Sequence, residues 1–279
     1  MKVFSDIREI GLIPRQQFEE RCTAYTEHVY LGNNVVLCKI LTKYKMFVDT
    51  RDIGVTPHLI MDGYWESWIT QCMARIVKPG DVCVDVGANF GYYSFLMSEL
   101  CGPSGRTVAI EPNPRVVETL RSSEVIHSWR FDVIQAALGD KNGDATLTFP
   151  DKYLGGGTLL QQSNFEGKSQ VRVKLTTFDD LVAQLNLPKV DVIKMDVEGL
   201  EPNVFAGMKN TIANNPNLKM IIEYSPFCYS NKKEFSDYLF SNFVINRIKD
   251  VAEMETLDKE AMDKLVELTD HTDFYLIRK

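Results

Sequence analysis

The stretch DVGANFGYYS, Asp85–Ser94, directly follows the apolar residues VCV and places two glycines in a short turn before a helix-like segment. A strand followed by a glycine-containing turn and a helix is typical of α/β proteins that bind a ligand close to the backbone. The dinucleotide fingerprint Gly-x-Gly-x-x-Gly is incomplete here, because Asn89 and Tyr92 occupy its second and third glycine positions. The turn therefore predicts a ligand site. Two alternatives stay open: the protein is a nicotinamide-dependent oxidoreductase, or, as the simplest case, the turn binds no ligand.

The segments around this turn alternate between strand-like and helix-like patterns. VCVDV, TVAI, FDVIQAAL, VDVIKMDVEG and LKMIIEY are apolar and strand-like. Helix-like segments separate them, among them GYYSFLMSEL, RVVETLRSSEV, the Thr-capped TTFDDLVAQL and PNVFAGMKNTIA. FVINRI and DFYLIRK are expected to close the chain as two further strands, and Asn142-Gly143 to form a hairpin turn. This order predicts an α/β fold with a mainly parallel sheet and helices on both faces. Residues 1–75 are expected to form an N-terminal cap with short strands at NVVLCKIL and KMFVDT and a helix beginning in GYWESWITQCMARIV, and residues 76–279 the ligand-binding domain.

Composition limits the class of protein. Of the 279 residues, 44% are hydrophobic and 25% are charged, as in a globular protein with a large core. The net charge of −7 argues against a nucleic-acid partner. The six cysteines include no Cys-x-x-Cys pair, and no run of about 18 apolar residues predicts a membrane span. Together with an N-terminus too polar for a signal peptide, these features predict a cytoplasmic location.

Charge at the turn distinguishes among ligands. Asp85 lies at the strand end, where it would repel a pyrophosphate and attract the cationic methionyl end of S-adenosylmethionine. Glu111 ends the next strand, 24 residues after Gly87, close to the spacing at which an acidic side chain binds ribose hydroxyls. The alternative for Glu111 is that it caps the helix that begins in EPNPRVVETL.

In order along the chain, GYWESW, VKPGDVCVDVGANFGYYS, AIEPNP, AALGDKNG, TTFDDL and VIKMDVEGLE resemble the FkbM family of S-adenosylmethionine-dependent methyltransferases. The resemblance covers roughly residues 60–225. It implies a Rossmann-like, seven-stranded methyltransferase sheet with an antiparallel seventh strand, and O-methylation of a hydroxyl on a sugar, glycan or polyketide-type acceptor. It also places Tyr64, Trp65 and Glu66 beside the methionyl end of the cofactor.

The expected cofactor site combines the turn with the neighbouring strand ends. Its predicted residues are Glu66, Asp85, Gly87, Ala88, Asn89, Phe90, Gly91, Tyr92, Glu111, Pro112, Asn113, Gln135, Ala136 and Asp196.

Methyl transfer to a hydroxyl needs orientation and a base. Asp196 and Glu223 end neighbouring strands and are the first candidates, and His58 is the histidine nearest the GYWESW segment. Glu198 either faces the same opening or, like Asp196, caps the next helix. A divalent metal held by Asp196 and Glu223 is an alternative that is not favoured, because a third oxygen ligand is not identified.

Two further hypotheses concern the acceptor. Lys194, Asp196 and Glu223 also suggest an RNA ribose 2′-O-methyltransferase, although the acidic charge counts against it. The segment YLGGGTLLQQSNFEG contains Gly155, Gly156 and Gly157, which predict either a mobile gate over the acceptor or a simple linker.

Overall fold

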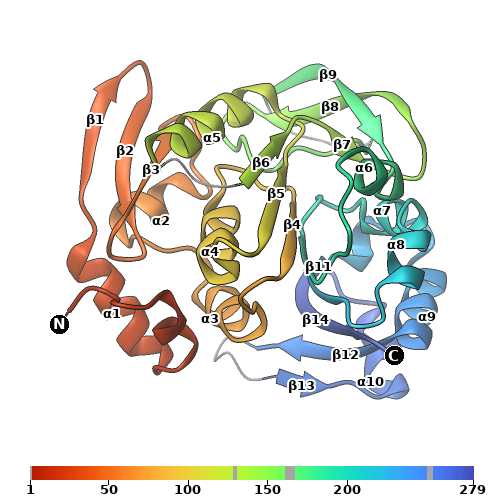
Figure 1. Ribbon diagram of the computed structural model, residues 1–279. Coiled ribbons are helices and arrows are strands. Elements are labelled where there is room, and N and C mark those ends of the chain that lie inside the picture. The colour runs from red at the N-terminus through yellow and green to blue at the C-terminus, as the bar shows by residue number, and fades with distance from the viewer. Residues whose placement is uncertain (1, 128–130, 161–166, 250–253) are drawn as a thin grey trace.

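The computed structural model describes residues 2–127, 131–160, 167–249 and 254–279, and a large central sheet organises them (Figure 1). The order of its strands is β13-β12-β14-β11-β10-β4-β5-β6. Their bounds are β4 (Val82–Val86), β5 (Arg106–Ile110), β6 (Phe131–Ile134), β10 (Val192–Met195), β11 (Lys219–Tyr224), β12 (Phe243–Ile248), β13 (Met254–Thr256) and β14 (Thr272–Arg278).

The strands β6, β5, β4, β10 and β11 run parallel, and β14 is antiparallel to both of its neighbours, β11 and β12. This confirms the predicted Rossmann-like sheet with one antiparallel strand. The sheet has an eighth strand, the three-residue edge strand β13, which the sequence analysis missed.

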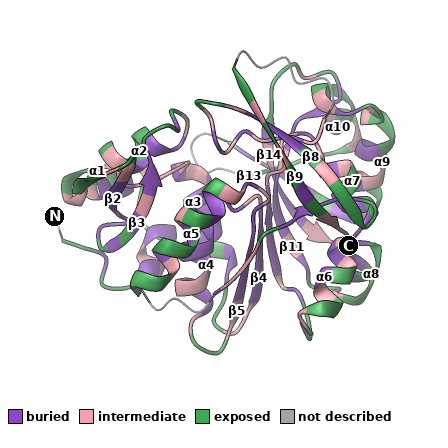
Figure 2. Cartoon of the chain, turned by 90° about the horizontal axis from the view of Figure 1, so that it is seen from above, coloured by how far each residue is buried: buried purple, intermediate pink, exposed green. Residues whose placement is uncertain are grey.

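Helices cover both faces of this sheet (Figure 2). One face carries α3 (Ser67–Ile76), α4 (Tyr92–Cys101) and α5 (Pro114–His127), and the other carries α6 (Phe178–Gln184), α7 (Glu201–Ala206), α8 (Lys209–Asn214), α9 (Lys232–Asn242) and α10 (Lys259–Leu265). The buried residues of β4 explain this arrangement. Cys83 belongs to one hydrophobic cluster and Val82, Val84 and Val86 belong to the other, because successive strand residues point to opposite faces. A strand buried on both faces needs a continuous apolar pattern, as VCVDV has, and Asp85 is its one charged exception.

The N-terminal part packs against the α3 and α4 face. It contains the 3-10 helix η1 (Ile7–Gly11), α1 (Arg15–Tyr25), β1 (His28–Gly32), β2 (Val35–Ile40), β3 (Tyr44–Asp49) and α2 (Thr56–Met61). The strands β1, β2 and β3 form an antiparallel sheet, of which the sequence analysis predicted β2 and β3 and missed β1. Because α3 runs past residue 75 and packs on η1, α4 and β11, the boundary between residues 75 and 76 stays a prediction.

A third sheet, in the order β7-β9-β8, follows β6. Its strands are β7 (Ala137–Leu138), β8 (Gly143–Pro150) and β9 (Lys168–Thr176), and the predicted hairpin at Asn142-Gly143 is wrong because β8 pairs with β9 and not with β7. The Asn142 side chain instead accepts hydrogen bonds from the Thr176 hydroxyl and the Thr177 amide, which anchors the segment to the end of β9.

Two other predicted elements are divided. FDVIQAAL splits into β6 and β7, which lie in different sheets. The helix predicted over PNVFAGMKNTIA is two helices, α7 and α8, that meet at Gly207, where a Cβ atom would lie 2.1 Å from the Gly139 carbonyl oxygen. The short 3-10 helix η2 (Pro226–Cys228) follows β11. Among the described residues, none of the helices is long and apolar enough to cross a membrane.

Candidate cofactor and acceptor site

The turn between β4 and α4 is tight because the end of β10 lies directly against it. Gly87 has φ +78°, and a Cβ atom there would lie 1.8 Å from the carbonyl oxygen of Asp196. The Asp196 amide in turn donates to the Val86 carbonyl at 2.9 Å, so the two strand ends are fixed to each other. Glycine is therefore required at residue 87 by sterics alone.

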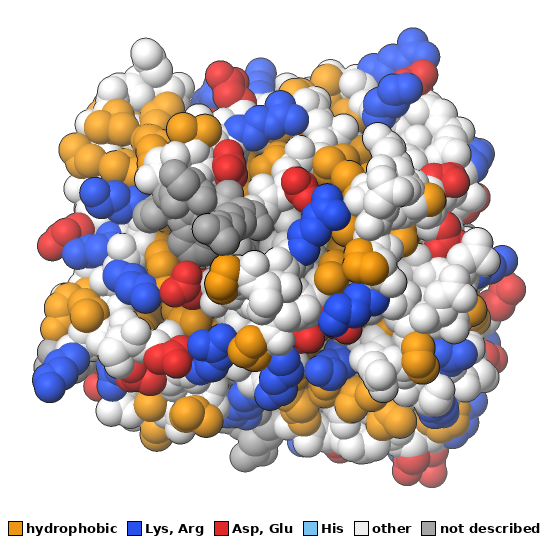
Figure 3. All heavy atoms as spheres, in the orientation of Figure 1, with side chains coloured by type: hydrophobic (Ala, Val, Ile, Leu, Met, Phe, Trp, Pro, Cys, Tyr) orange, Lys and Arg blue, Asp and Glu red, His pale blue; other side chains and the backbone are white. Residues whose placement is uncertain are grey.

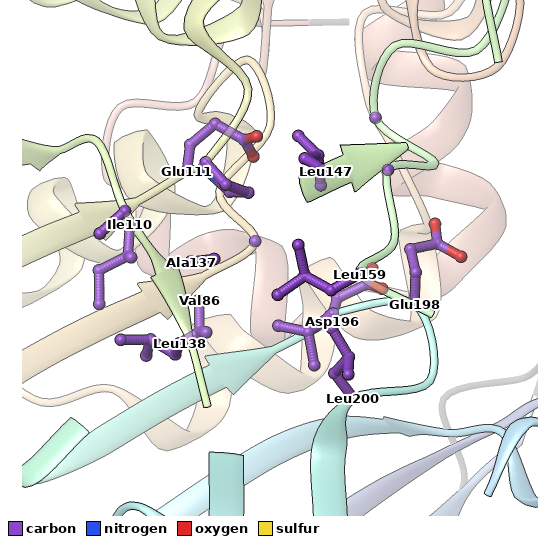
Figure 4. A pocket seen from close by; sticks show the side chains of 16 residues that line it. Val86, Ile110, Glu111, Ala137, Leu138, Leu147, Leu159, Asp196, Glu198 and Leu200 are labelled. Atoms are coloured by element: carbon purple, nitrogen blue, oxygen red, sulfur yellow. The ribbon is translucent and has the colours of Figure 1, made fainter. Parts of the chain in front are cut away.

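A cavity, here called the Glu111 cavity, opens beside this turn (Figure 4). Glu111 lies on one side of it and Asp196 and Glu198 on the other. Most of the remaining wall is apolar and consists of Val86, Ile110, Ala137, Leu138, Leu147 and Leu159. A flat apolar ring with polar groups at one edge fits such a cavity.

Two backbone amides hold the Glu111 carboxylate. Oε1 accepts from the Asn113 N–H at 2.8 Å and Oε2 accepts from the Asn89 N–H at 3.0 Å. Burial raises the pKa of Glu111 to about 7, against the two hydrogen bonds, which lower it. The carboxylate thus joins the turn after β4 to the start of α5, and each oxygen retains a lone pair for a ligand.

A second hollow, the Lys194 cavity, continues from the Glu111 cavity, with which it shares Gly87, Gly155, Asp196 and Glu198. The Lys194 Nζ atom donates to Asp196 Oδ2 at 2.7 Å and lies 5.3 Å from the centre of the Tyr93 ring.

Carboxylates outnumber cations around Lys194. Asp85 accepts from the Ser94 hydroxyl at 2.6 Å, and Glu66 accepts from the Tyr93 hydroxyl at 2.8 Å. Burial raises the pKa of Asp85 to about 6 and that of Glu66 to about 7, although Lys194 lowers both. Burial alone would lower the pKa of Lys194, but Asp196, Glu66 and Asp85 raise it overall. One ammonium group thus faces three carboxyl groups, an arrangement that favours a further cation.

A third hollow of about 440 Å³, the Glu223 cavity, lies on the outer side and shares Trp65 and Tyr153 with the Lys194 cavity. Glu223 accepts from the Ser225 hydroxyl at 2.7 Å, and burial raises its pKa to about 7. His271 lines the same cavity. Partial burial lowers the pKa of His271, but the nearby Glu223 and Asp273 raise it overall.

Most of the predicted site residues lie together. Ala88, Asn89, Phe90 and Tyr92 line the Lys194 cavity, Pro112 and Ala136 line the Glu111 cavity, Glu66 and Glu223 line the Glu223 cavity, and Asp196 lines all three. Asp85 is buried beneath the turn. Glu198 lines all three cavities as well, which agrees with the reading that it faces the opening.

Four predicted residues line none of the three cavities, namely Asp85, Gly91, Asn113 and Gln135, and His58 lies at the rim of one. Gly91 and Asn113 are not among the lining residues, and Asn113 instead donates from Nδ2 to the Leu154 carbonyl at 3.1 Å. Gln135 is exposed and lines a separate hollow beside α5. His58 lies at the rim of the Glu223 cavity, 56% exposed, with Nδ1 3.2 Å from Asp62 Oδ2.

The sequence analysis assigned no role to Tyr153, Leu147, Leu159 or His271, although each lines at least one cavity. They come from the third sheet, its connecting loop and the segment before β14, where no periodic pattern marks a site. The triple glycine has a steric role, since a Cβ atom at Gly155 would lie 2.3 Å from the Asn89 side chain. Part of the proposed gate, residues 161–166, lies outside the described residues, and the gate stays a prediction.

Within residues 2–127, 131–160, 167–249 and 254–279, no group of three or more His, Cys, Asp or Glu side chains is arranged to hold a metal ion.

The amino-acid sequence of the chain is similar to those of known methyltransferases. The model of the FkbM methyltransferase domain matches residues 85–262. The chain is 27% identical to 31-O-demethyl-FK506 methyltransferase FkbM of Streptomyces tacrolimicus, over 57% of this chain and 72% of that protein. It is 28% identical to hexuronic acid methyltransferase AglP of Haloferax volcanii, over 55% of this chain and 60% of that protein. It is 27% identical to 2-O-methyltransferase NoeI of Sinorhizobium fredii, over 51% of this chain and 63% of that protein.

Proposed function

This chain belongs to the FkbM methyltransferase family, and we propose that it transfers a methyl group from S-adenosylmethionine to a hydroxyl of a sugar, glycan or polyketide-type small molecule. The names of its relatives support this acceptor class, since they describe methylation of a demethyl-FK506, of a hexuronic acid and of a 2-hydroxyl position. The observation that carries the proposal is the excess of buried carboxyl groups beside the Gly87 turn, which suits a cofactor whose reacting end is cationic.

The residues present fit this cofactor. The apolar walls of the Glu111 cavity would enclose the adenine ring, and the Glu111 carboxylate would accept the ribose hydroxyls. The methionyl end would lie in the Lys194 cavity. There, Asn89 Oδ1 is buried without a hydrogen-bond partner among the described residues, as expected where a ligand supplies a donor.

When bound, the cofactor supplies a methyl group on a sulfonium, which is transferred by in-line displacement. The protein residues orient the acceptor and remove its proton. Glu223 is the proposed proton acceptor, because it lines the Glu223 cavity and its pKa, raised by burial to about 7, suits a base at neutral pH. Asp196, held by Lys194 at 2.7 Å, is a positioning group between the cofactor and the acceptor. His58 is paired with Asp62 at the rim and is a weaker candidate.

Electrostatics also address the alternatives. Figure 3 shows both basic and acidic side chains on the face that it presents, and the net charge of −7 does not favour RNA as a partner. The nicotinamide alternative is disfavoured because the carboxyl groups around the Gly87 turn would repel the negatively charged pyrophosphate of that cofactor. The six cysteines are unpaired, which supports the proposal of a cytoplasmic protein.

Calorimetry tests the proposal. We expect S-adenosylmethionine and S-adenosylhomocysteine to bind the protein and NADH not to bind. Glu66→Gln retains the hydrogen bond from Tyr93 but removes a negative charge, so it should weaken the binding of S-adenosylmethionine about tenfold. A protein that binds neither sulfur compound would overturn the proposal.

A further inference from the structure

The Glu223 cavity is where the acceptor would enter, if the proposed function holds. It joins the Lys194 cavity through Trp65, Tyr153, Asp196 and Glu198, so a molecule lying in it reaches the methyl-donor end of the cofactor site. Its volume of about 440 Å³ is the largest of the three adjoining hollows and lies within the range of small-molecule sites.

Aromatic side chains form part of the wall of this cavity. They are Tyr64, Trp65, Trp68 and Tyr153. Contacts hold two of these rings, since Trp68 Nε1 donates to Asp273 Oδ2 at 3.0 Å and the Trp65 ring centre lies 5.2 Å from that of His58. Rigid aromatic faces favour ligands that present a flat face of C–H groups, and they attract cations through the negative face of the ring.

Carboxyl groups form most of the polar part of the wall. Among the described residues that line the cavity, six are acidic: Glu19, Asp62, Glu66, Asp196, Glu198 and Glu223. The basic lining residues are Arg15, His58 and His271.

Two of these basic side chains are already paired within the wall. Arg15 Nε lies 2.6 Å from Glu19 Oε1, and His58 Nδ1 lies 3.2 Å from Asp62 Oδ2. His271 faces Glu223 and Asp273, and its Nδ1 lies 3.1 Å from Asp270 Oδ1. Each described cation of the wall therefore lies beside a carboxyl group that offsets its charge, whereas Glu66, Glu198 and Glu223 are without an ion-pair partner in the wall at hydrogen-bonding distance.

We infer that the acceptor is a polyhydroxylated ring compound without a negative charge, and that an amino group on the ring strengthens its binding. Carboxyl groups hydrogen-bond to hydroxyl groups and to ammonium groups, and the aromatic rings pack against the C–H face of the acceptor. Uronic acids, sugar phosphates and RNA are poor acceptors, because each brings an anion next to the Glu223 carboxylate. Glu198, whose pKa burial raises to about 9, is mainly protonated and supplies no positive charge to offset that repulsion.

Three matched probes test this inference: the methyl glycosides of glucosamine, glucose and glucuronic acid. They share one ring and differ in a single substituent. Binding to the protein saturated with S-adenosylhomocysteine is followed at pH about 7.5, above the pKa of about 7 of Glu223, by tryptophan fluorescence, to which Trp65 and Trp68 contribute from the wall. We expect the glucosaminide to bind most tightly and the glucuronide to bind at least about tenfold more weakly than the glucoside, the size expected of one like-charge repulsion.

A charge variant locates the effect. In the double variant Glu198→Gln, Glu223→Gln, the disadvantage of the glucuronide should shrink by about tenfold. In Glu260→Gln, which removes a charge on the exposed surface of α10, the disadvantage should stay unchanged. Failure to bind S-adenosylhomocysteine at all would count against the proposed function. If that compound binds, equal binding of glucuronide and glucoside, binding of none of the three probes, or an unchanged disadvantage in the double variant would overturn the inference.

Discussion

Replacing Glu111 with glutamine tests the link between the turn, the helix and the cofactor. The carboxylate accepts one hydrogen bond from the Asn89 amide at 3.0 Å and another from the Asn113 amide at 2.8 Å. A glutamine side chain has one acceptor oxygen and one NH₂ group, so one of these backbone amides loses its partner. An unsatisfied buried N–H costs about 1–3 kcal/mol, partly offset because the neutral amide avoids burying a charge. We therefore expect the melting temperature of the ligand-free protein to fall by roughly 2–4 °C.

The same change removes the charge-assisted hydrogen bonds that Glu111 would accept from two ribose hydroxyls. Their loss is worth about 1.5–3 kcal/mol in all, or roughly ten- to hundred-fold in cofactor affinity. Calorimetric titration with S-adenosylhomocysteine measures the affinity, and differential scanning fluorimetry measures the melting temperature on the same sample. Glu118→Gln, on the exposed side of α5, is the matched control and should change neither quantity. A Glu111→Gln protein that binds S-adenosylhomocysteine within about twofold of the parent would remove Glu111 from the site and refute the reasoning.

Three other predictions follow from the same contacts. Gly87→Ala should destabilise the protein by more than about 1 kcal/mol and abolish cofactor binding, because its Cβ would lie 1.8 Å from the Asp196 carbonyl oxygen. The control is Gly32→Ala, where φ is +90° but the space around the Cβ is open, so that only the backbone strain should appear when the free energy of unfolding of both variants is measured in urea. Glu223→Gln should lower kcat with little change in cofactor affinity and remove the rise in rate through pH about 7, and an unaltered pH profile would exclude Glu223 as the base. Burial raises the pKa of Glu66, Glu111 and Glu223 from 4.5 to about 7, so between these pH values the folded protein binds more protons than the unfolded chain. The free energy of unfolding of the ligand-free protein should therefore fall as the pH rises from about 4.5 to about 7. A rise over that range in urea titrations would contradict these pKa shifts.

Local patterns in the sequence predicted the central sheet well. The apolar strands, the glycine turn and the Thr177 cap of α6, whose side chain accepts from the Asp180 amide, are all set by residues close together in the chain. Asp85, Glu111 and Asp196 followed from the same patterns, because parallel strands end at one edge of the sheet and bring their following residues together. The side chains that the strand ends place at the site could therefore be predicted from the sequence.

Contacts between distant segments could not be read in the same way. The pairing of β8 with β9 depends on a return of the chain after a long connection, and a short Asn-Gly sequence gives a stronger local signal for a hairpin that does not form. Tyr153 and His271 reach the site from segments without a periodic pattern, so their proximity to Glu223 appears only in three dimensions. A sequence pattern identifies the strand ends, whereas the loops that complete the acceptor side of the site show no comparable pattern.

Glu111 shows why two readings of one residue need not exclude each other. From the sequence, ribose binding and helix capping were alternatives, because each seemed to require the whole carboxylate. In the structure, one oxygen accepts from the Asn113 amide near the start of α5 and the other accepts from the Asn89 amide of the turn, while the group still lines the cavity. A carboxylate offers about four lone pairs, and two backbone amides use only half of them. The hydrogen bonds that fix Glu111 in the fold therefore also orient its remaining lone pairs toward a ligand, so stability and cofactor affinity should fall together when it is changed.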